Sequence, residues 1–301
     1  MKTVISVSLG SSRRNHSVTT ELLGESITIE RRGTDGDVER AVAMIQDLDG
    51  KVDAIGLGGV DLYLVAGKRR YPLRDARTMR EAAQITPVVD GTGLKNTLER
   101  RTVAWLDDQG IVAFKDKRVL IVSALDRYGM AEEMERRGAR LTLGDAIFAL
   151  GLPLPFHSLR TLGVILWILS PIITRLPMKM LYPTGKEQNE TRPRFGRHYH
   201  AADIIAGDLH FIRRYMPTDL SGKTIITNTI TKDNEEEFKE RGVRLLVTTT
   251  PNLDGRSFGT NVMEGVLVAL SGRRPEELTE KDYEDLLDRL GLLPRLEYLN
   301  D

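Results

Sequence analysis

Short apolar runs alternate with segments of helical periodicity along most of the 301-residue chain, and this rhythm constrains the fold more than any other feature. Such runs are typical of buried strands, and the segments between them are typical of crossover helices. Strands that alternate with helices indicate an α/β protein with a mostly parallel sheet. The expected strands are 4–9, 26–30, 52–57, 86–89, 118–122, 141–143, 203–206, 224–227 and 245–248, and the expected helices are 38–47, 94–106, 126–138, 232–242, 262–270 and 275–290.

The length of the chain predicts two domains, because single domains have roughly 100–200 residues. We expect an N-terminal α/β domain over residues 1–110 that holds a substrate. Residues 111–301 are expected to form a Rossmann-like, nucleotide-binding domain with an apolar insertion at about 152–195.

Charge and cysteine content exclude several classes of function. The chain carries 43 basic and 43 acidic residues, so its net charge gives no reason to expect nucleic acid as a partner. The absence of cysteine excludes disulfides, thiolate metal sites and thiol nucleophiles. The N-terminus follows a strand pattern rather than that of a signal peptide, so we expect a cytoplasmic protein.

The segment from Val119 to Asp145 has the layout of a dinucleotide-binding unit: strand, turn, helix, strand and acid. The candidate phosphate contacts are Ser123, Ala124, Asp126, Arg127 and Gly129. Gly129 fits the third glycine position of such a turn, and Ala124 could stand for the first. Asp126 occupies the second, where its charge opposes a diphosphate unless Arg127 or the start of the helix compensates.

Asp145 lies 22 residues beyond Ser123, where an acid usually holds the adenine ribose. An acid at this position predicts NAD rather than NADP. Alternatively, Asp145 binds no ligand and caps the helix at 146–150. Asn228, at the end of the strand over 224–227, is expected to line the same edge of the sheet.

A second glycine-rich turn and a long polar loop are candidate substrate sites. The turn contains Gly91 and Gly93 and opens a helix whose first residues include Lys95 and Thr97. It either binds an anion or hydroxyl or is a structural turn. The loop over 248–261 carries Arg256 and Asn261, a fork for carboxylate or phosphate and a side chain that can both donate and accept.

The titratable side chains on predicted loops are Lys95 and Asp61 in the first half and His210 and Asp208 in the second, and Lys95 and Asp61 are the candidates for acid–base catalysis. His198, His200 and His210 match no metal-binding spacing such as HExxH, so no metal site is expected.

The uncharged segment from Thr161 to Thr174 breaks the strand–helix rhythm. Its 14 residues are too few to span a bilayer, which needs about 20. Three interpretations remain: a buried or dimer-forming helix, a lid over an apolar pocket, and a helix lying in a membrane interface. The first is favoured, and a homo-oligomer is expected.

Two stretches of the chain together resemble a known family. They are DAIGLGGVDLYLVAGKRRYPLRDA followed by TPVVDGTGLKNTLERR, and GKTIITNTITKDNEEEFKERGVRLLVTTTPNLDGRSFGTNVMEG. They are similar to bacterial proteins described as quinate 5-dehydrogenase or shikimate/quinate dehydrogenase-like. The resemblance implies an N-terminal substrate domain, a C-terminal Rossmann domain and a catalytic lysine with an aspartate partner.

Lys95 is the nearest counterpart of that lysine, without the proline that precedes it in the family, and Asp61 and Asp126 are the candidate partners. The glycine-rich cofactor turn of the family is absent. The sequence therefore predicts an NAD- or NADP-dependent oxidoreductase for a hydroxylated or carboxylated small molecule. The alternatives are a Rossmann-like binding or regulatory protein without redox activity, and a reductase or transferase of an acyl or lipid substrate.

Overall fold

The computed structural model describes residues 1–66, 69–175, 192–253 and 256–301, and within these ranges the side chains of 64–66, 69–70, 74–75, 252–253 and 256–257 lie outside the description. It confirms the α/β class. The strands are β1 Lys2–Ser8, β2 His16–Leu22, β3 Glu25–Gly33, β4 Ala54–Gly58, β5 Tyr63–Ala66, β6 Arg69–Pro72, β7 Val88–Val89, β8 Arg118–Ile121, β9 Arg140–Leu143, β10 Ile204–Gly207, β11 Thr224–Thr227, β12 Leu245–Thr248, β13 Asn252–Leu253, β14 Arg256–Ser257 and β15 Arg295–Tyr298. The helices are α1 Val38–Leu48, α2 Arg74–Arg80, α3 Thr92–Asp108, α4 Tyr128–Arg136, α5 Asp145–Phe148, α6 Leu159–Ile173, α8 Gly196–Ala201, α9 Leu209–Tyr215, α10 Lys232–Glu240, α11 Thr260–Ser271 and α12 Glu280–Leu290, with short 3₁₀ turns at Ser12–Arg14 and Pro275–Glu277.

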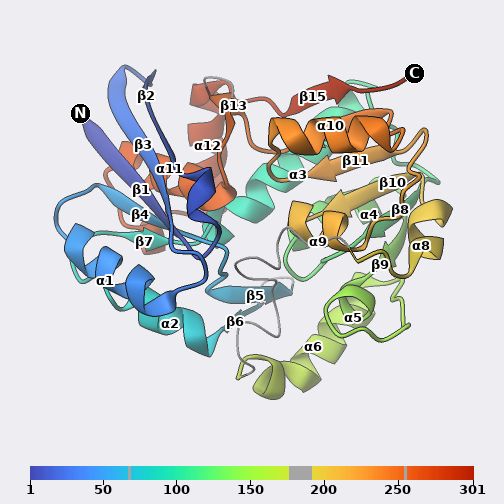
Figure 1. Ribbon diagram of the computed structural model, residues 1–301, viewed down its shortest axis with the longest axis horizontal. Coiled ribbons are helices and arrows are strands. Elements are labelled where there is room, and N and C mark those ends of the chain that lie inside the picture. Colours follow the sequence, from blue (N-terminus) through green and yellow to red (C-terminus); the bar gives the residue numbers. More distant parts are fainter. Residues whose placement is uncertain (67–68, 176–191, 254–255) are drawn as a thin grey trace.

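Two separate sheets form the framework and lie side by side in Figure 1. The first has the order β2-β3-β1-β4-β7 and is parallel except for the edge strand β2. The second has the order β15-β12-β11-β10-β8-β9 and is parallel except for the edge strand β15. The predicted strands of both sheets are confirmed, whereas β2 and β15 had no counterpart in the sequence-based assignment.

Helices cover both faces of each sheet, as the continuous burial of the central strands requires. In the first sheet, Ile5, Val7 and Ile55 pack toward α1, whereas Val4 and Ala54 pack toward α11. In the second sheet, one apolar cluster includes residues of α3 and α4, and the other includes residues of α5, α8, α9 and α10.

Helix α3 joins the two halves. Leu94 and Leu98, near its start, belong to the core of the first sheet, whereas Val103 and Leu106 belong to the core of the second. The long helix therefore fixes the two sheets relative to each other.

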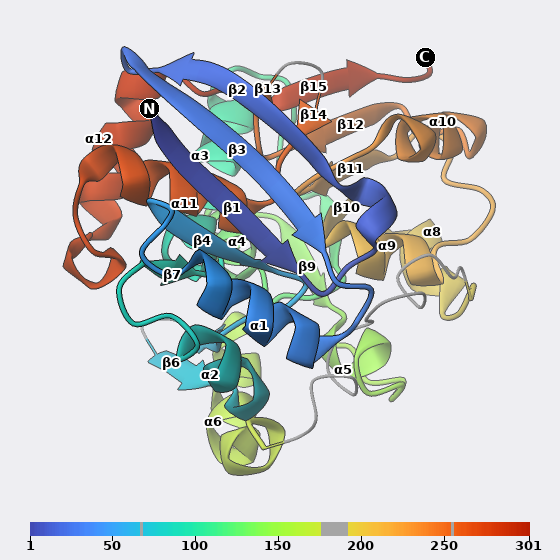
Figure 2. The same cartoon turned by 60° about the vertical axis from the view of Figure 1, so that its left-hand side comes forward.

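The C-terminal part of the chain returns to the first sheet. Helix α11 packs on β1, β3, β4 and β7, and α12 packs on α3, as Figures 1 and 2 show. Gly265 in α11 lies so close to β1 that an added Cβ would stand 2.9 Å from Val4. The two sheets fall on either side of the boundary expected near residue 110, but helices from the second half cover the first sheet.

The apolar segment 161–174 forms most of α6, which the sequence favoured as a buried or dimer-forming helix. Only one face of it is buried, through Leu159, Leu162 and Leu166. No residue of α6 lines the cavity described below, so the lid interpretation has no support there. No helix in the described part of the chain has the length and apolar character needed to cross a membrane.

Candidate functional site

A cavity of about 710 Å³ lies between the two sheets, a volume that suits a small molecule. Its lining comes from the carboxyl ends of parallel strands in both sheets, where ligands of α/β proteins bind. The first sheet contributes Ser6 and Ser8 of β1, Arg31 of β3, Gly58 and Gly59 at the end of β4 and Asp90 after β7. The second contributes Asp126 after β8, Asp208 after β10 and Asn228 after β11.

One end of the cavity is basic. Arg31 donates hydrogen bonds to the Ser8 hydroxyl at 2.9 Å and to the Ser11 carbonyl at 3.0 Å, and it contacts no carboxylate among the described residues. Burial and the nearby Arg14 guanidinium lower the pKa of Arg31 to about 10, although the charge of Asp35 opposes this shift. A guanidinium whose charge is destabilised by burial and by a neighbouring cation forms a site where a bound anion is favourable.

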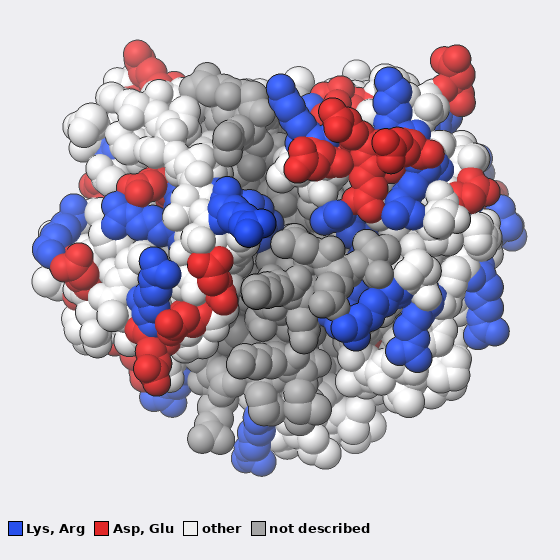
Figure 3. Space-filling view, viewed as in Figure 1, with Lys and Arg blue, Asp and Glu red and all other residues white. Residues whose placement is uncertain are grey.

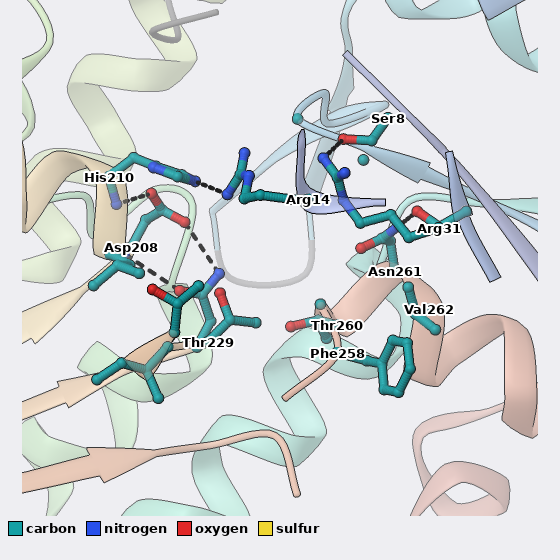
Figure 4. Close-up of a pocket in the computed structure, with 18 of the residues that line it drawn as sticks. Ser8, Arg14, Arg31, Asp208, His210, Thr229, Phe258, Thr260, Asn261 and Val262 are labelled. Carbon is teal, nitrogen blue, oxygen red and sulfur yellow. Dashed lines mark hydrogen bonds between the residues drawn. The ribbon is translucent and has the colours of Figure 1, made fainter. Parts of the chain in front are cut away.

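The side chains around this end face a common space. Figure 4 shows Asp208, His210 and Thr229 on one side of the cavity and Arg31, Thr260 and Phe258 on the other. The Thr260 hydroxyl is buried and has no hydrogen-bond partner within the described part of the chain. It can therefore bind a polar group of a ligand.

The other end holds a compact cluster of charges. The Lys95 ammonium lies 2.8 Å from an Asp61 carboxylate oxygen and 2.6 Å from an Asp126 carboxylate oxygen. The three side chains are at most 13% exposed. Lys95 is in the first turn of α3, which begins after Gly91 in the left-handed region (φ 97°), so the start of the helix aims the lysine into the cavity.

Burial and neighbouring charges give the two aspartates opposite properties. Burial raises the pKa of Asp61 to about 7, although Lys95 opposes this shift. Burial also acts to raise the pKa of Asp126, but Arg127 and Lys95 outweigh it and hold that pKa at about 2. Asp61 can therefore exchange a proton near neutral pH while Asp126 stays ionised.

For Lys95, burial alone would lower the pKa, but the carboxylates of Asp126 and Asp61 outweigh it and raise the pKa above its ordinary value. The lysine is therefore a fixed positive charge, able to donate a hydrogen bond to a substrate oxygen.

A buried arginine connects the cluster to the second sheet. Arg127 pairs with Glu99 and Asp126, and its Nη2 lies 3.3 Å from Asp208. The Asn228 amide donates to the same Asp208 oxygen at 3.1 Å. With Lys95 and Asp61, this network has four carboxyl groups and two cations, and burial raises the pKa values of Asp61 and Glu99. Protonation of Asp61 or Glu99 reduces the excess of negative over positive charge in this network.

The turn expected to hold a diphosphate is closed by the protein itself. The N–H groups of Ala124 and Leu125 donate to the Asp145 carboxylate at 3.1 and 2.9 Å, and the Arg127 N–H donates to the Ser123 carbonyl. The Gly129 N–H donates to the Asn96 side chain at 2.8 Å. An added Cβ on Gly129 would stand 2.6 Å from the Asn96 backbone, so this glycine serves the contact of α4 with α3.

These residues, as they are arranged, do not fit a dinucleotide. Donors that would meet a diphosphate are already used, and Ser123, Ala124, Gly129 and Asp145 do not line the cavity. Asp145 neither faces a ribose nor caps a helix; burial raises its pKa to about 6, and it ties the turn together. NAD or NADP binding at this turn stays a prediction that these contacts oppose.

The other predicted residues divide between the cavity and the packing of α11. Lys95, Asp61, Asp126, Arg127, Asn228 and Asn261 all line the cavity. Gly91, Gly93 and Thr97 do not: the Gly91 N–H donates to Glu264 of α11 at 2.7 Å, and an added Cβ on Gly93 would meet the same carboxylate. These two glycines therefore serve the structure, as the alternative reading of that turn had it.

Asn261 donates to the Ser6 hydroxyl at 2.9 Å and brings the start of α11 against β1. The side chain of Arg256 lies outside the described residues, so its predicted role stays a prediction.

Sequence reasoning missed the basic end of the cavity. Arg31 follows Ile27 and Ile29 at a spacing of two in β3, and both isoleucines are fully buried. A charged residue that continues a buried face of a strand needs a polar partner or a ligand, and this pattern was the signal.

The described residues form no metal-binding cluster, and those on the face drawn in Figure 3 carry charges of both signs. Among the residues that the structure describes, no group of His, Asp and Glu could hold a metal ion. Figure 3 shows acidic and basic side chains interspersed over the face in view.

Two family models match the chain, one over residues 93–299 and one over residues 3–90, and both are described as domains of unknown function, DUF8754 and DUF8753. No curated protein matches it. Similar solved structures include a galactofuranose binding protein, at 13% identity over 97% of this chain and 99% of that one with a TM-score of 0.36. The NAD-dependent malic enzyme of Thermotoga maritima is 13% identical over 96% of this chain and 84% of that one, with a TM-score of 0.36. The L-tryptophan dehydrogenase of Nostoc punctiforme is 12% identical over 89% of this chain and 68% of that one, with a TM-score of 0.33. Structural similarities with TM-scores this low do not indicate a function. Because residues 93–299 make up more than half of the chain, the protein belongs to the DUF8754 family.

Proposed function

We propose that the protein binds a small hydroxylated anion, such as a hydroxy acid, between its two sheets, that Asp61 exchanges a proton with it, and that Lys95 stabilises the negative charge that develops. One observation carries this proposal. A single cavity joins Arg31, which forms no ion pair among the described residues, to the cluster of Lys95, Asp61 and Asp126.

Each end of the cavity has a distinct task in this proposal. Arg31 holds the acidic group of the ligand through its guanidinium, and the Thr260 hydroxyl, which has no partner among the described residues, binds a hydroxyl group. Asp61 takes or returns a proton because its pKa of about 7 matches neutral conditions. The Lys95 ammonium stabilises negative charge that develops on a substrate oxygen, and Asp126 fixes the position of that ammonium.

Thermal unfolding with a panel of ligands tests this function. Quinate and shikimate, which carry a carboxylate and hydroxyls, are compared with inositol, which carries hydroxyls alone. We expect a hydroxy acid to raise the melting temperature and inositol to leave it unchanged. Arg31→Gln should remove the effect, whereas Arg32→Gln should keep it, because Arg32 pairs with Glu30 and does not line the cavity. Equal responses of the two variants would refute a role of Arg31.

A second candidate is an NAD- or NADP-dependent dehydrogenase for such a substrate, as the resemblance to quinate and shikimate dehydrogenases implies. The buried Asp61 beside Lys95 favours it, because oxidation of a hydroxyl needs a group that accepts its proton and the pKa of Asp61 is raised to about 7. Titration with NADH and NADPH, followed by nucleotide fluorescence, tests it. No change at millimolar nucleotide would remove this candidate and leave the proton-transfer proposal intact.

A further inference from the structure

Exposed apolar side chains concentrate in one part of the chain. Of the thirteen large hydrophobic side chains that are exposed within the described residues, eight lie between positions 150 and 172. They are Leu150, Leu152, Leu154, Val164, Trp167, Ile168, Leu169 and Ile172. Such a concentration marks an interaction surface rather than the scattered exposure common to soluble domains.

Helix α6 carries most of these side chains on a single face. Leu159, Leu162 and Leu166 are buried against the body of the protein. On the opposite face, Val164, Ile168 and Ile172 follow each other at a spacing of four and are 51%, 60% and 63% exposed. A helix on the surface of a globular protein usually presents polar residues there.

The charges around this face indicate what covers it. No aspartate or glutamate occurs in the sequence from Ala146 to Lys186, and exposed arginines, Arg160 and Arg175, lie near the two ends of α6. An apolar face with a tryptophan and with basic ends complements an anionic lipid surface, where tryptophan favours the interface and arginine favours the headgroups.

The length and position of α6 suit such a surface. Its 15 residues extend about 22 Å, too short for the roughly 30 Å of a hydrocarbon core, so the helix can only lie in the interface plane. Both Figure 1 and Figure 2 place α6 at the lower edge of the molecule.

We propose that the exposed face of α6 docks the protein reversibly on an anionic membrane surface. The side chains of Trp167, Ile168 and Ile172 enter the boundary between headgroups and acyl chains, while Arg160 and Arg175 contact lipid phosphates. No residue of α6 lines the cavity, so docking is separate from the proposed chemistry.

Flotation of the full chain with vesicles tests this proposal. Vesicles of phosphatidylcholine with phosphatidylglycerol are compared with vesicles of phosphatidylcholine alone. We expect the protein to float with the anionic vesicles and to bind the neutral ones more weakly. Replacing both arginines by glutamine should lower the partition onto anionic vesicles about 5-fold for each arginine.

The double variant Ile168→Glu/Ile172→Glu should remain unbound, whereas Leu293→Glu should float like the wild type, because Leu293 is 54% exposed outside this region. Trp167 provides an independent readout in a Trp105→Phe background, where we expect its emission to shift to shorter wavelength with anionic vesicles. Absence of flotation by the wild type overturns the proposal. So does a dimer in solution that the double variant dissociates, because α6 would then be a contact between two copies of this chain.

Discussion

Replacing Asp61 by asparagine tests the electrostatics of the site, because burial raises the pKa of this carboxyl from an ordinary 3.8 to about 7. Asparagine keeps the shape of the side chain and cannot ionise. A shift of this size corresponds to about 4 kcal/mol of folding free energy.

The sign of the effect follows from proton binding. Between pH 4 and pH 7 the folded protein keeps a proton on Asp61 that the unfolded chain releases, so the free energy of unfolding falls as the pH rises. This contribution is fully present below the ordinary pKa and is lost above about pH 7. Asp145 and Glu99, whose pKa values are also raised, act in the same direction in both proteins and cancel in the comparison.

Urea denaturation from pH 4.5 to pH 8 measures the effect. The free energy of unfolding of the wild type should fall by about 3 kcal/mol more than that of Asp61→Asn over this pH range, because the range covers most of the interval between the ordinary and the raised pKa of Asp61. Asp47→Asn is the control, since this exposed carboxylate pairs with Lys51 away from the cavity, and it should keep the wild-type slope. Parallel pH profiles of wild type and Asp61→Asn would refute the raised pKa.

Two further predictions concern the packing and the chemistry of the site. Gly129→Ala should destabilise the protein by about 1–3 kcal/mol in urea denaturation, because the new methyl would overlap the Asn96 backbone. The control Gly163→Ala should not destabilise it, because nothing lies within 4 Å of an added Cβ there. Equal effects of the two substitutions would contradict the close contact of α4 with α3. Lys95→Met should slow the exchange of a carbon-bound hydrogen of a bound hydroxy acid for solvent deuterium by at least about 100-fold, as followed by NMR, because the negative charge left when Asp61 takes that proton would lose its stabilising ammonium. Exchange at the wild-type rate would show that the lysine takes no part.

The parallel cores could be predicted from the sequence, because buried strands are apolar along their whole length. Strand β15, with the sequence RLEY, escaped prediction because it lies at a sheet edge and mixes charged with apolar residues. The packing of α11 on the first sheet could not be predicted from the sequence either. It depends on contacts such as that of Gly91 with Glu264, 173 residues apart in sequence, which no local pattern encodes.

The candidate site was predicted in part. Lys95 and Asp61 were named as titratable side chains on predicted loops, and Asp126 was named as a residue of the candidate phosphate turn and as a possible aspartate partner in the family resemblance. Their mutual contacts, and the opposite pKa values of the two aspartates, follow from burial that the sequence does not show. The spacing of Asp145 from the turn fitted a ribose ligand, yet the same spacing lets its carboxylate close the turn.

A crystal structure of the protein with the hydroxy acid that most raises its melting temperature tests the central claim most directly. We expect the ligand between the two sheets, with its carboxylate on Arg31 and a hydroxyl within hydrogen-bond distance of Lys95 or Asp61. A ligand bound outside this cavity, or inside it with the carboxylate away from Arg31 and no contact with Lys95 or Asp61, would contradict the account.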